Sequence, residues 1–301
     1  MVAVDRIDDL EQLDEGGTGS PESDVLPDAH EARAPRRFDR AQFARKAWLA
    51  TWPKVAAIAV FLLLWQIPVW LDYKPFVIKG PSEVLGDLWV LLKDGVIADA
   101  AWNTLKRVAV GFAVSIVLGV AVGAMVSSSK IVRSAIGSMI SGVQTMPSIA
   151  WFPLAIAIFG RTEGAIRFVI VLGAAPAIAN GLITGVDQVP PLLLRAGRML
   201  GAGGVKSYRH VILPATLPSF VGGLKQGWAF AWRSLLAGEL LVIIARKPSV
   251  GNLLSQYREL SKYSEMMAMM IVIFTIGLVV DALFFSTVDR AIRRRWGLLT
   301  D

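Results

Sequence analysis

A glycine-rich run beside basic residues is the part of the chain whose composition could bind phosphate. It reads GAGGVKS at residues 201–207. A nucleotide-binding loop of the form G-x-x-x-x-G-K-[ST] needs a glycine directly before its lysine, so that backbone N–H groups can wrap the phosphates. Val205 occupies that position and Leu200 occupies the position of the first glycine. The run therefore lacks both glycines that a phosphate loop requires, and its glycines call for another role.

Ionisable side chains inside an apolar segment are the second chemical feature. Arg233 and Glu239 lie within the apolar stretch 219–244, and charges at such positions are costly and suggest function. Six residues correspond to about 240° around a helix, so the two side chains are not an i,i+4 pair and need separate partners or a water-filled cavity. An arginine facing a cavity could attract an oxyanion. A structural arginine bonded to carbonyls or to a distant carboxylate is the alternative.

Prolines interrupt a second apolar stretch, residues 131–160. Pro147 and Pro153 remove backbone donors, which membrane helices tolerate where neighbouring groups or water satisfy the freed carbonyls. Polar residues beside this break could line a gate, although a packing kink would look the same. The predicted pathway residues are Gln144, Thr145, Pro147, Trp232, Arg233 and Glu239.

The composition indicates an all-α polytopic membrane protein. Hydrophobic residues make up 54% of the 301 residues and the mean hydropathy is +0.54, above the usual apolar share of soluble domains. The chain has no cysteine and two histidines, which excludes disulfides, thiol nucleophiles and histidine-rich metal sites. The net charge of +7 is consistent with basic residues retained on the cytoplasmic side of a membrane.

The N-terminal region begins with an acidic segment, which is followed by a basic one. Residues 1–35 contain ten acidic residues and are predicted to be a disordered tail. Residues 36–50 mix basic and aromatic side chains directly before an apolar segment. Such a pattern can bind RNA, but its position favours an interfacial amphipathic helix on the membrane surface over nucleic-acid binding.

Six transmembrane helices are predicted within a membrane domain of residues 51–289, each long enough to cross a hydrocarbon core of about 30 Å. Their approximate ranges are 55–71, 108–126, 131–160, 165–186, 219–244 and 266–286. Gly119 and Gly123 form a GxxxG pair that permits close helix contact. An even number of spans places both termini on one side, and basic residues in 36–50 and in the C-terminal segment 290–301 place that side in the cytoplasm of a bacterial plasma (inner) membrane.

On this topology the loop 187–216 is cytoplasmic, and it is unusually long for a helix connection. Its sequence predicts two short helices around a glycine turn, with Pro214 and Pro218 ending or kinking the second helix. A short amphipathic helix projecting into the cytoplasm can dock in a groove of a partner.

The loop resembles the EAA motif, E-A-A-x3-G-x9-I-x-L-P, of ATP-binding-cassette importer permeases. Ala196 matches the first alanine, Gly201 the glycine and Val211 the isoleucine, whereas Arg195 replaces the glutamate and Gly197 the second alanine. The predicted ATPase-docking residues are Arg195, Ala196, Gly197, Leu200, Gly201, Ala202, Val211, Leu213 and Pro214.

Further stretches, such as QTMPSIAWFPLAIAIFG and GLKQGWAFAWRSLLAGEL, are similar to the nitrate, sulfonate, taurine and bicarbonate branch of these permeases. The resemblance implies the type I importer permease fold and a non-catalytic subunit that forms the pathway for a small anion. It implies two ATPase subunits that bind ATP and Mg, a second permease copy, most simply an identical one, and a periplasmic or lipid-anchored solute-binding protein.

Two other classes remain to be weighed. A self-sufficient secondary transporter would show internal repeats and ion-coupling carboxylates. No repeat is visible, and Glu239 and Asp281 are the only carboxylates within the predicted spans. A membrane-embedded enzyme is less consistent still, because no nucleophile motif or paired histidines are present.

Overall fold

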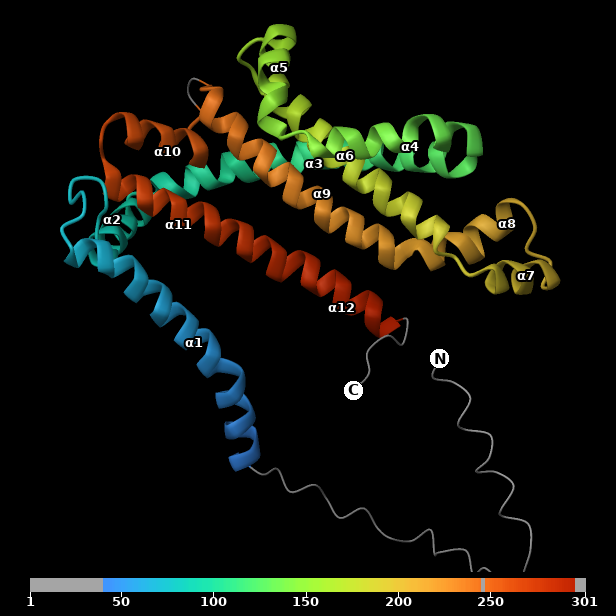
Figure 1. The fold of residues 1–301 in the computed structure, drawn as a ribbon, viewed down its shortest axis with the longest axis horizontal. Helices are drawn as coiled ribbons and strands as arrows, with labels where there is room; N and C mark the ends of the chain where they lie inside the picture. Colours follow the sequence, from blue (N-terminus) through green and yellow to red (C-terminus); the bar gives the residue numbers. More distant parts are fainter. Residues whose placement is uncertain (1–39, 245–246, 296–301) are drawn as a thin grey trace, which may run out of the picture. The chain divides into compact units, whose positions relative to one another are not determined.

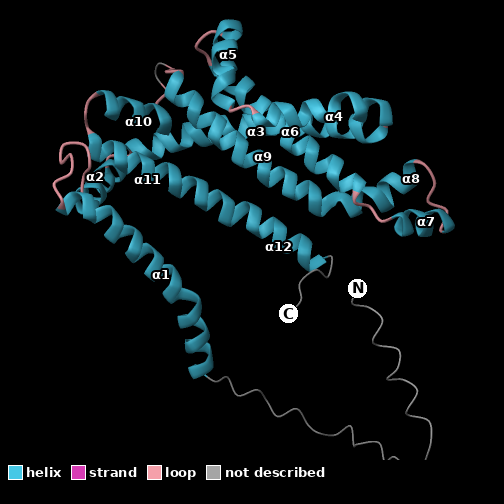
Figure 2. Ribbon diagram, viewed as in Figure 1, coloured by secondary structure: helices cyan, strands magenta, loops and turns pink. Residues whose placement is uncertain are grey.

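The computed structural model describes residues 40–244 and 247–295, and all regular structure in that part of the chain is helical (Figures 1 and 2). The predicted all-α class is confirmed. The predicted acidic tail, residues 1–35, lies outside the described residues, as do residues 36–39 and 296–301.

The structure contains α-helices, one 3₁₀ turn (η1) and two π-helical turns (η2 and η3). In chain order they are α1 (Arg40–Trp70), α2 (Pro81–Lys93), α3 (Val96–Ser128), α4 (Lys130–Thr145), η1 (Ser148–Trp151), α5 (Phe152–Phe159), α6 (Glu163–Asp187), α7 (Pro191–Met199), α8 (Val205–Ser207), η2 (Tyr208–Ile212), α9 (Leu213–Leu241), α10 (Val250–Glu259), α11 (Tyr263–Val280), η3 (Asp281–Phe285) and α12 (Ser286–Arg295).

The chain divides into two compact units within α1, after Ala57. The contacts and sites described below all lie in the second unit, Ile58–Asp301. The sequence predicts a separate interfacial helix at 36–50, whereas the helix that begins at Arg40 continues without a break to Trp70.

Four helical segments of the described residues are long and apolar enough to cross a membrane: Thr51–Trp70, Val96–Ser128, Glu163–Asp187 and Tyr263–Val288. The predicted third span is two helical pieces, Ile131–Thr145 and Ser148–Phe159, bent by 102° at the proline break, and counts as a fifth span only if the pair is one broken span. The predicted fifth span lies in α9. This helix is not apolar enough to count as a candidate membrane span, because its polar and charged residues lower its hydropathy.

Helix α6 packs along both α9 and α3 (Figure 1). Lipid tails are as apolar as leucine, so helices associate in a bilayer through close packing rather than through burial from water. Gly119 of α3 supplies such packing, because a β-carbon there would lie 2.8 Å from the Ala175 carbonyl oxygen of α6. Gly181 of α6 and Gly223 of α9 approach still more closely, and a β-carbon on Gly181 would lie 2.5 Å from the Gly223 Cα. The predicted close contact at Gly119 and Gly123 is confirmed.

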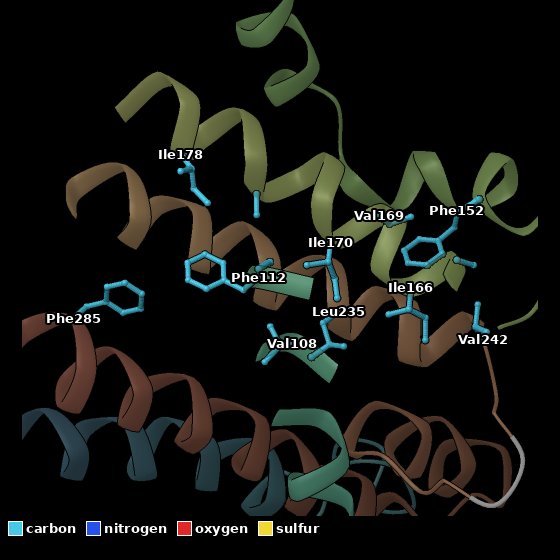
Figure 3. Packing of buried hydrophobic residues seen from close by; sticks show 14 residues of the cluster. Val108, Phe112, Phe152, Ile166, Val169, Ile170, Ile178, Leu235, Val242 and Phe285 are labelled. Atoms are coloured by element: carbon cyan, nitrogen blue, oxygen red, sulfur yellow. The ribbon is translucent and has the colours of Figure 1, made fainter. Parts of the chain in front are cut away.

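Large apolar side chains from four helices complete this core (Figure 3). They include Val108 and Phe112 of α3, Phe152 of α5, Ile166, Ile170 and Ile178 of α6, and Leu235 of α9. Phe112 meets Trp228 of α9 edge to face, with ring centroids 5.3 Å apart. The side chains therefore fix how α3, α6 and α9 are rotated against one another.

The helix does not end at Pro214 or Pro218, because α9 runs through both residues. Pro214 falls in the first turn of α9, where a missing N–H costs nothing. The preceding turn is π-helical, and the Leu213 N–H donates to the Tyr208 carbonyl. Widening of the turn before Pro214 therefore lets the chain pass from the loop into α9 without a break.

Candidate functional site

Helix α7 of the loop 187–216 ends in a Schellman turn, which explains why a glycine stands at position 201. The Gly201 N–H donates to the Arg198 carbonyl at 3.0 Å, and the Ala202 N–H donates to the Gly197 carbonyl at 2.9 Å. This pattern places the residue after the helix in the left-handed region, and Gly201 has φ +79°. The motif glycine is thus required by backbone conformation, since a β-carbon at Gly201 would have open space around it.

The two departures from the EAA motif differ in their surroundings. Gly197 is buried, and a β-carbon there would lie 2.8 Å from Cγ2 of Val211. The glycine in place of the second alanine therefore lets α7 pack directly on the π-helical turn η2 that contains Val211. Arg195, in place of the glutamate, is exposed, and Ala196 beside it is half-buried.

The outer surface of the loop combines apolar and basic side chains. The exposed apolar residues are Leu192, Leu193, Met199, Leu200, Val205 and Leu213, and the exposed basic residues are Arg195, Arg198, Lys206 and Arg209. Among the described residues, no acidic side chain lies between Asp187 and Glu239. Such a surface can bury apolar area against a partner that supplies negative charge.

A groove of about 920 Å³ runs between α9 and the α11–η3 helix. Two of the predicted pathway residues, Trp232 and Arg233, line it, together with Lys225 and Gln226 of α9 and Asp281 of η3. The Lys225 Nζ lies 3.2 Å from a carboxylate oxygen of Asp281. The ammonium and the carboxylate thus face each other across the groove.

Arg233 has no carboxylate partner among the described residues. Its Nε donates to the Ala229 carbonyl one turn earlier at 3.0 Å, and its guanidinium lies over the Phe230 ring at 4.9 Å. Its side chain is exposed and lines the groove. Gly222 also lines this groove and has open space around it, whereas Gly223 and Gly227 face α6.

The polar residues at the proline break lie elsewhere. The Gln144 Oε1 accepts a hydrogen bond from Asn180 of α6 at 2.6 Å, and the Thr145 hydroxyl donates to the Gly142 carbonyl of its own helix at 2.7 Å. Pro147 directly precedes η1. None of these residues lines the α9–α11 groove, so the structure separates Gln144, Thr145 and Pro147 from Trp232 and Arg233.

Glu239, predicted as a pathway residue, is fully buried and lies outside the groove. Its carboxylate accepts hydrogen bonds from Arg107 Nη1 at 2.5 Å, from the Gly251 N–H at 3.0 Å and from the Thr104 hydroxyl at 3.1 Å. The Thr104 oxygen in turn accepts the Val250 N–H at 3.0 Å, which leaves its own proton for Glu239. The carboxylate thus ties α9 to α3 and to the start of α10.

Arg107 connects this buried carboxylate to a second one. Its Nε and Nη2 donate to the two oxygens of Glu163, at 2.8 and 2.9 Å. A bidentate pair of this kind fixes both distance and orientation. Glu163 is the first residue of α6, directly after the Thr162 hydroxyl that accepts the Gly164 N–H at 3.2 Å. The network Thr104–Arg107–Glu163–Glu239 therefore joins α3, α6, α9 and α10.

Sequence reasoning did not find Arg107 or Glu163, because the second span was expected to begin at residue 108 and the fourth at residue 165. Helix α3 begins at Val96, so Arg107 lies one helical turn before Gly111 on the same buried face. Buried positions at 100, 104, 107, 111, 115, 119 and 123 follow helical spacing, and this spacing was the available signal. Among residues 40–244 and 247–295, no group of three or more His, Asp or Glu side chains could hold a metal ion.

Comparison with known proteins relates this architecture to transport. Residues 115–296 match the family model described as "Binding-protein-dependent transport system inner membrane component". A protein of Methanocaldococcus jannaschii, assigned as an ABC transporter permease, is 30% identical over 76% of this chain and 86% of its own length. The nitrate import permease protein NrtB of Synechocystis is 28% identical over 76% of this chain and 86% of its own length. The bicarbonate transport system permease protein CmpB of Synechococcus elongatus is 25% identical over 80% and 88%.

Solved structures show the same fold. The inward-facing MetNI methionine ABC transporter aligns with a TM-score of 0.54 and 21% identity, covering 68% of this chain and 96% of the matched chain. An amino acid ABC transporter aligns with a TM-score of 0.55 and 18% identity over 69% and 97%. Both matches support the type I importer permease fold. The chain belongs to the binding-protein-dependent transport system inner membrane component family and is the non-catalytic, multi-pass inner-membrane permease subunit of an ABC transporter.

Proposed function

We propose that this permease forms the translocation pathway for a small anionic solute in an ATP-driven importer, and that the groove between α9 and α11 is one wall of that pathway. The solute class is that of aliphatic sulfonates and taurine, nitrate or bicarbonate. The observation that carries the proposal is the pair of cationic side chains, Lys225 and Arg233, on the groove face of α9.

The depth of these two side chains supports this assignment. Helix α9 has 29 residues, a length of about 43 Å at 1.5 Å per residue. Lys225 is about 18 Å and Arg233 about 30 Å from its first residue, by the same rise per residue, so Lys225 is near the middle of the helix. Ionisable side chains at such depth face water-filled cavities or protein rather than lipid. The groove that they line is therefore better suited to an aqueous path than to a lipid contact.

The chemistry of the groove favours an anion. A guanidinium and an ammonium donate charge-assisted hydrogen bonds to oxyanions, and the Trp228 and Trp232 rings stack beside them with centroids 6.4 Å apart. Asp281 pairs with Lys225, so Arg233 is the cation with donors free for a solute. The nitrate and bicarbonate permeases among the relatives are named for solutes of this class.

The groove is open on one side of a single chain, and its charged residues are partly or fully exposed. A second, identical copy would close it and enclose the pathway between two permeases. In this arrangement the permease has six spans, of which α9 is one and the bent pair α4–α5 is another. Both termini and the loop 187–216 are then in the cytoplasm.

Coupling to ATP follows from the loop. The surface of α7 and α8 would dock one of two ATPase subunits, which bind ATP and Mg, and closure of those subunits would move α7 as a lever. Gly197 and Val211 fasten α7 to η2, and η2 continues into α9, so movement of α7 would reach the groove wall. A solute-binding protein outside the membrane would deliver the anion.

Neutralising the groove arginine tests this proposal. We expect Arg233→Gln, in the complex reconstituted into liposomes, to lower uptake of labelled nitrate, bicarbonate or taurine by at least tenfold, because one hydrogen bond between charged groups contributes about 1.5–3 kcal/mol. ATP hydrolysis without solute and assembly with the ATPases should be retained. Arg290→Gln is the matched control, since its Nε also donates one turn back, to the Ser286 carbonyl at 3.0 Å, but lies outside the groove. Uptake by Arg233→Gln equal to that by Arg290→Gln would rule out a pathway role for Arg233.

A further inference from the structure

A second, smaller pocket lies at the other side of the buried ionic network. Its volume is about 230 Å³, and its walls come from α3, from the first turns of α6 and from Lys247 in the connection before α10. The charged side chains that line it are Lys106, Arg107, Glu163, Arg167 and Lys247. None of the α9–α11 groove residues takes part, so the two sites are distinct.

The pocket has an excess of positive charge. Four cations line it, and two carboxylates, Glu163 in the wall and Glu239 behind Arg107, oppose them; four minus two leaves two. Each of the three guanidinium nitrogens of Arg107 already binds a carboxylate, because its Nε and Nη2 donate to Glu163 and its Nη1 donates to Glu239. The Lys247 Nζ is 3.8 Å from Glu163, a long contact to a carboxylate already bound by Arg107.

The excess charge resides on the accessible side chains. Among the described residues no carboxylate lies within salt-bridge distance of Lys106 or Arg167. Both side chains are exposed, and the Lys106 Nζ lies over the Trp102 ring at 4.6 Å. Arg167, Lys106 and Lys247 thus retain donors, and all three residues line the same pocket. The Glu163 carboxylate holds the buried Arg107 in place at its base.

We infer that this pocket binds a small oxyanion, held by Arg167, Lys247 and Lys106, at a site separate from the translocation groove. Its volume falls below the roughly 300–1,000 Å³ of pockets for drug-sized ligands, which suits an ion of the size of nitrate, bicarbonate or a sulfonate headgroup. A guanidinium supplies paired donors in a plane, and the ammonium groups add charge from the sides.

The position of the pocket along α6 indicates the side of the membrane to which the pocket opens. Glu163 and Arg167 lie in the first turns of α6, whereas Asp187 ends the helix next to the loop 187–216. The 25 residues of α6 separate the two ends by about 36 Å, so the pocket is on the membrane face opposite α7. This orientation rests on the proposed function: if α7 docks a cytoplasmic ATPase, the pocket opens to the outside, where the solute arrives.

Binding to the purified permease–ATPase complex in detergent, without binding protein, tests the site. Thermal unfolding is followed while sodium nitrate or sodium bicarbonate replaces sodium gluconate at constant ionic strength. We expect a saturable rise in Tm, and at least a tenfold higher apparent Kd in the Arg167→Gln/Lys247→Gln variant. Lys93→Gln is the control for the change of charge, because Lys93 is an exposed lysine like Lys247 but lies outside the pocket. Binding that Arg233→Gln retains and the double variant loses belongs to this pocket and not to the groove.

Four results would overturn the inference. No saturable rise with either oxyanion, or a rise that the double variant retains, would show that the pocket is not the binding site. A rise lost only in Arg233→Gln would assign the ion to the groove and leave the proposed function standing. In nanodiscs, stabilisation by phosphatidylglycerol that the double variant abolishes, without any nitrate effect, would assign the pocket to a lipid headgroup instead of a free ion.

Discussion

Replacing Glu239 with glutamine tests the buried ionic network as the clamp between α3, α9 and α10. The substitution keeps the size of the side chain and removes its charge. One oxygen of the glutamine can still accept a hydrogen bond, but its amide group then faces either the Arg107 Nη1 or the Gly251 N–H, which are both donors. A buried acceptor is therefore exchanged for a donor opposite another donor.

The expected loss of stability follows from these contacts. A hydrogen bond between charged groups contributes about 1.5–3 kcal/mol, and a buried donor left unpaired costs about 1–3 kcal/mol. Together these give roughly 3–5 kcal/mol, the range seen when one partner of a buried ion pair is removed. Since 1 kcal/mol corresponds to about 2–4 °C in chains of 150–250 residues, we expect Tm to fall by roughly 6–20 °C.

Thermal unfolding of the purified complex in detergent measures this fall. Glu83→Gln is the control, because Glu83 pairs with Lys79 at 3.1 Å on the surface, with side chains 51% and 28% exposed, and such pairs contribute at most about 1 kcal/mol. Arg107→Gln and the Glu239→Gln/Arg107→Gln double variant complete a double-mutant cycle. We expect it to give a coupling free energy between Arg107 and Glu239 of at least about 1.5 kcal/mol.

Two outcomes would refute this reasoning. A Tm of Glu239→Gln within about 2 °C of that of Glu83→Gln would mean that the network does not clamp the helices, given 2–4 °C per kcal/mol. Strict additivity of Arg107→Gln and Glu239→Gln would mean that the two side chains do not act as a pair.

Two glycines give further predictions with internal controls. In Gly201→Val the valine must adopt φ +79°, a conformation that costs about 1–3 kcal/mol for a non-glycine residue. We therefore expect the turn after α7 to shift and solute uptake per ATP hydrolysed to drop. Gly203→Val is the control and should stay close to wild type, because Gly203 has open space around it and an ordinary φ. Equal coupling in the two variants would contradict a role for the turn. Gly181→Ala places a β-carbon 2.5 Å from the Gly223 Cα, so α6 and α9 must separate at a cost of about 1–3 kcal/mol. The Tm of this variant should fall by several degrees. Gly222→Ala should not lower Tm, because nothing lies within 4 Å of the added β-carbon. A Gly181→Ala protein as stable as Gly222→Ala would mean that the two helices are not in close contact.

Much of the fold was predictable because its causes are local. Long apolar runs identify the helices around residues 55–71, 108–126, 165–186 and 266–286, each within a segment that meets the length and hydropathy of a membrane span. A GxxxG pair at one helical spacing predicts close contact, and Gly119 does lie against α6. In α9, where polar and charged residues lower the hydropathy, the predicted span 219–244 does not meet the same length and hydropathy criteria.

The residues of the candidate site could be predicted from the sequence only where they lie close together on one helix. Trp232 and Arg233 share a turn of α9 and line one groove. Lys225, about two turns earlier on that helix, was missed because its partner Asp281 belongs to η3. Glu239 was recognised as a costly charge, but its partner Arg107 is 132 residues away, in a turn that the predicted span boundary left out.

The sequence by itself determined which segments are helical, which helix faces are small enough for close packing, and where α7 must end. These properties depend on backbone hydrogen bonding, side-chain size and the conformation of Gly201, all of which act within a few residues. Only the tertiary structure decided that Glu239 is buried against Arg107 and that Arg233 faces a groove. Both are charges on α9, six residues apart, and the rotation of that helix against α3, α6 and α11 gives one a partner and leaves the other its donors.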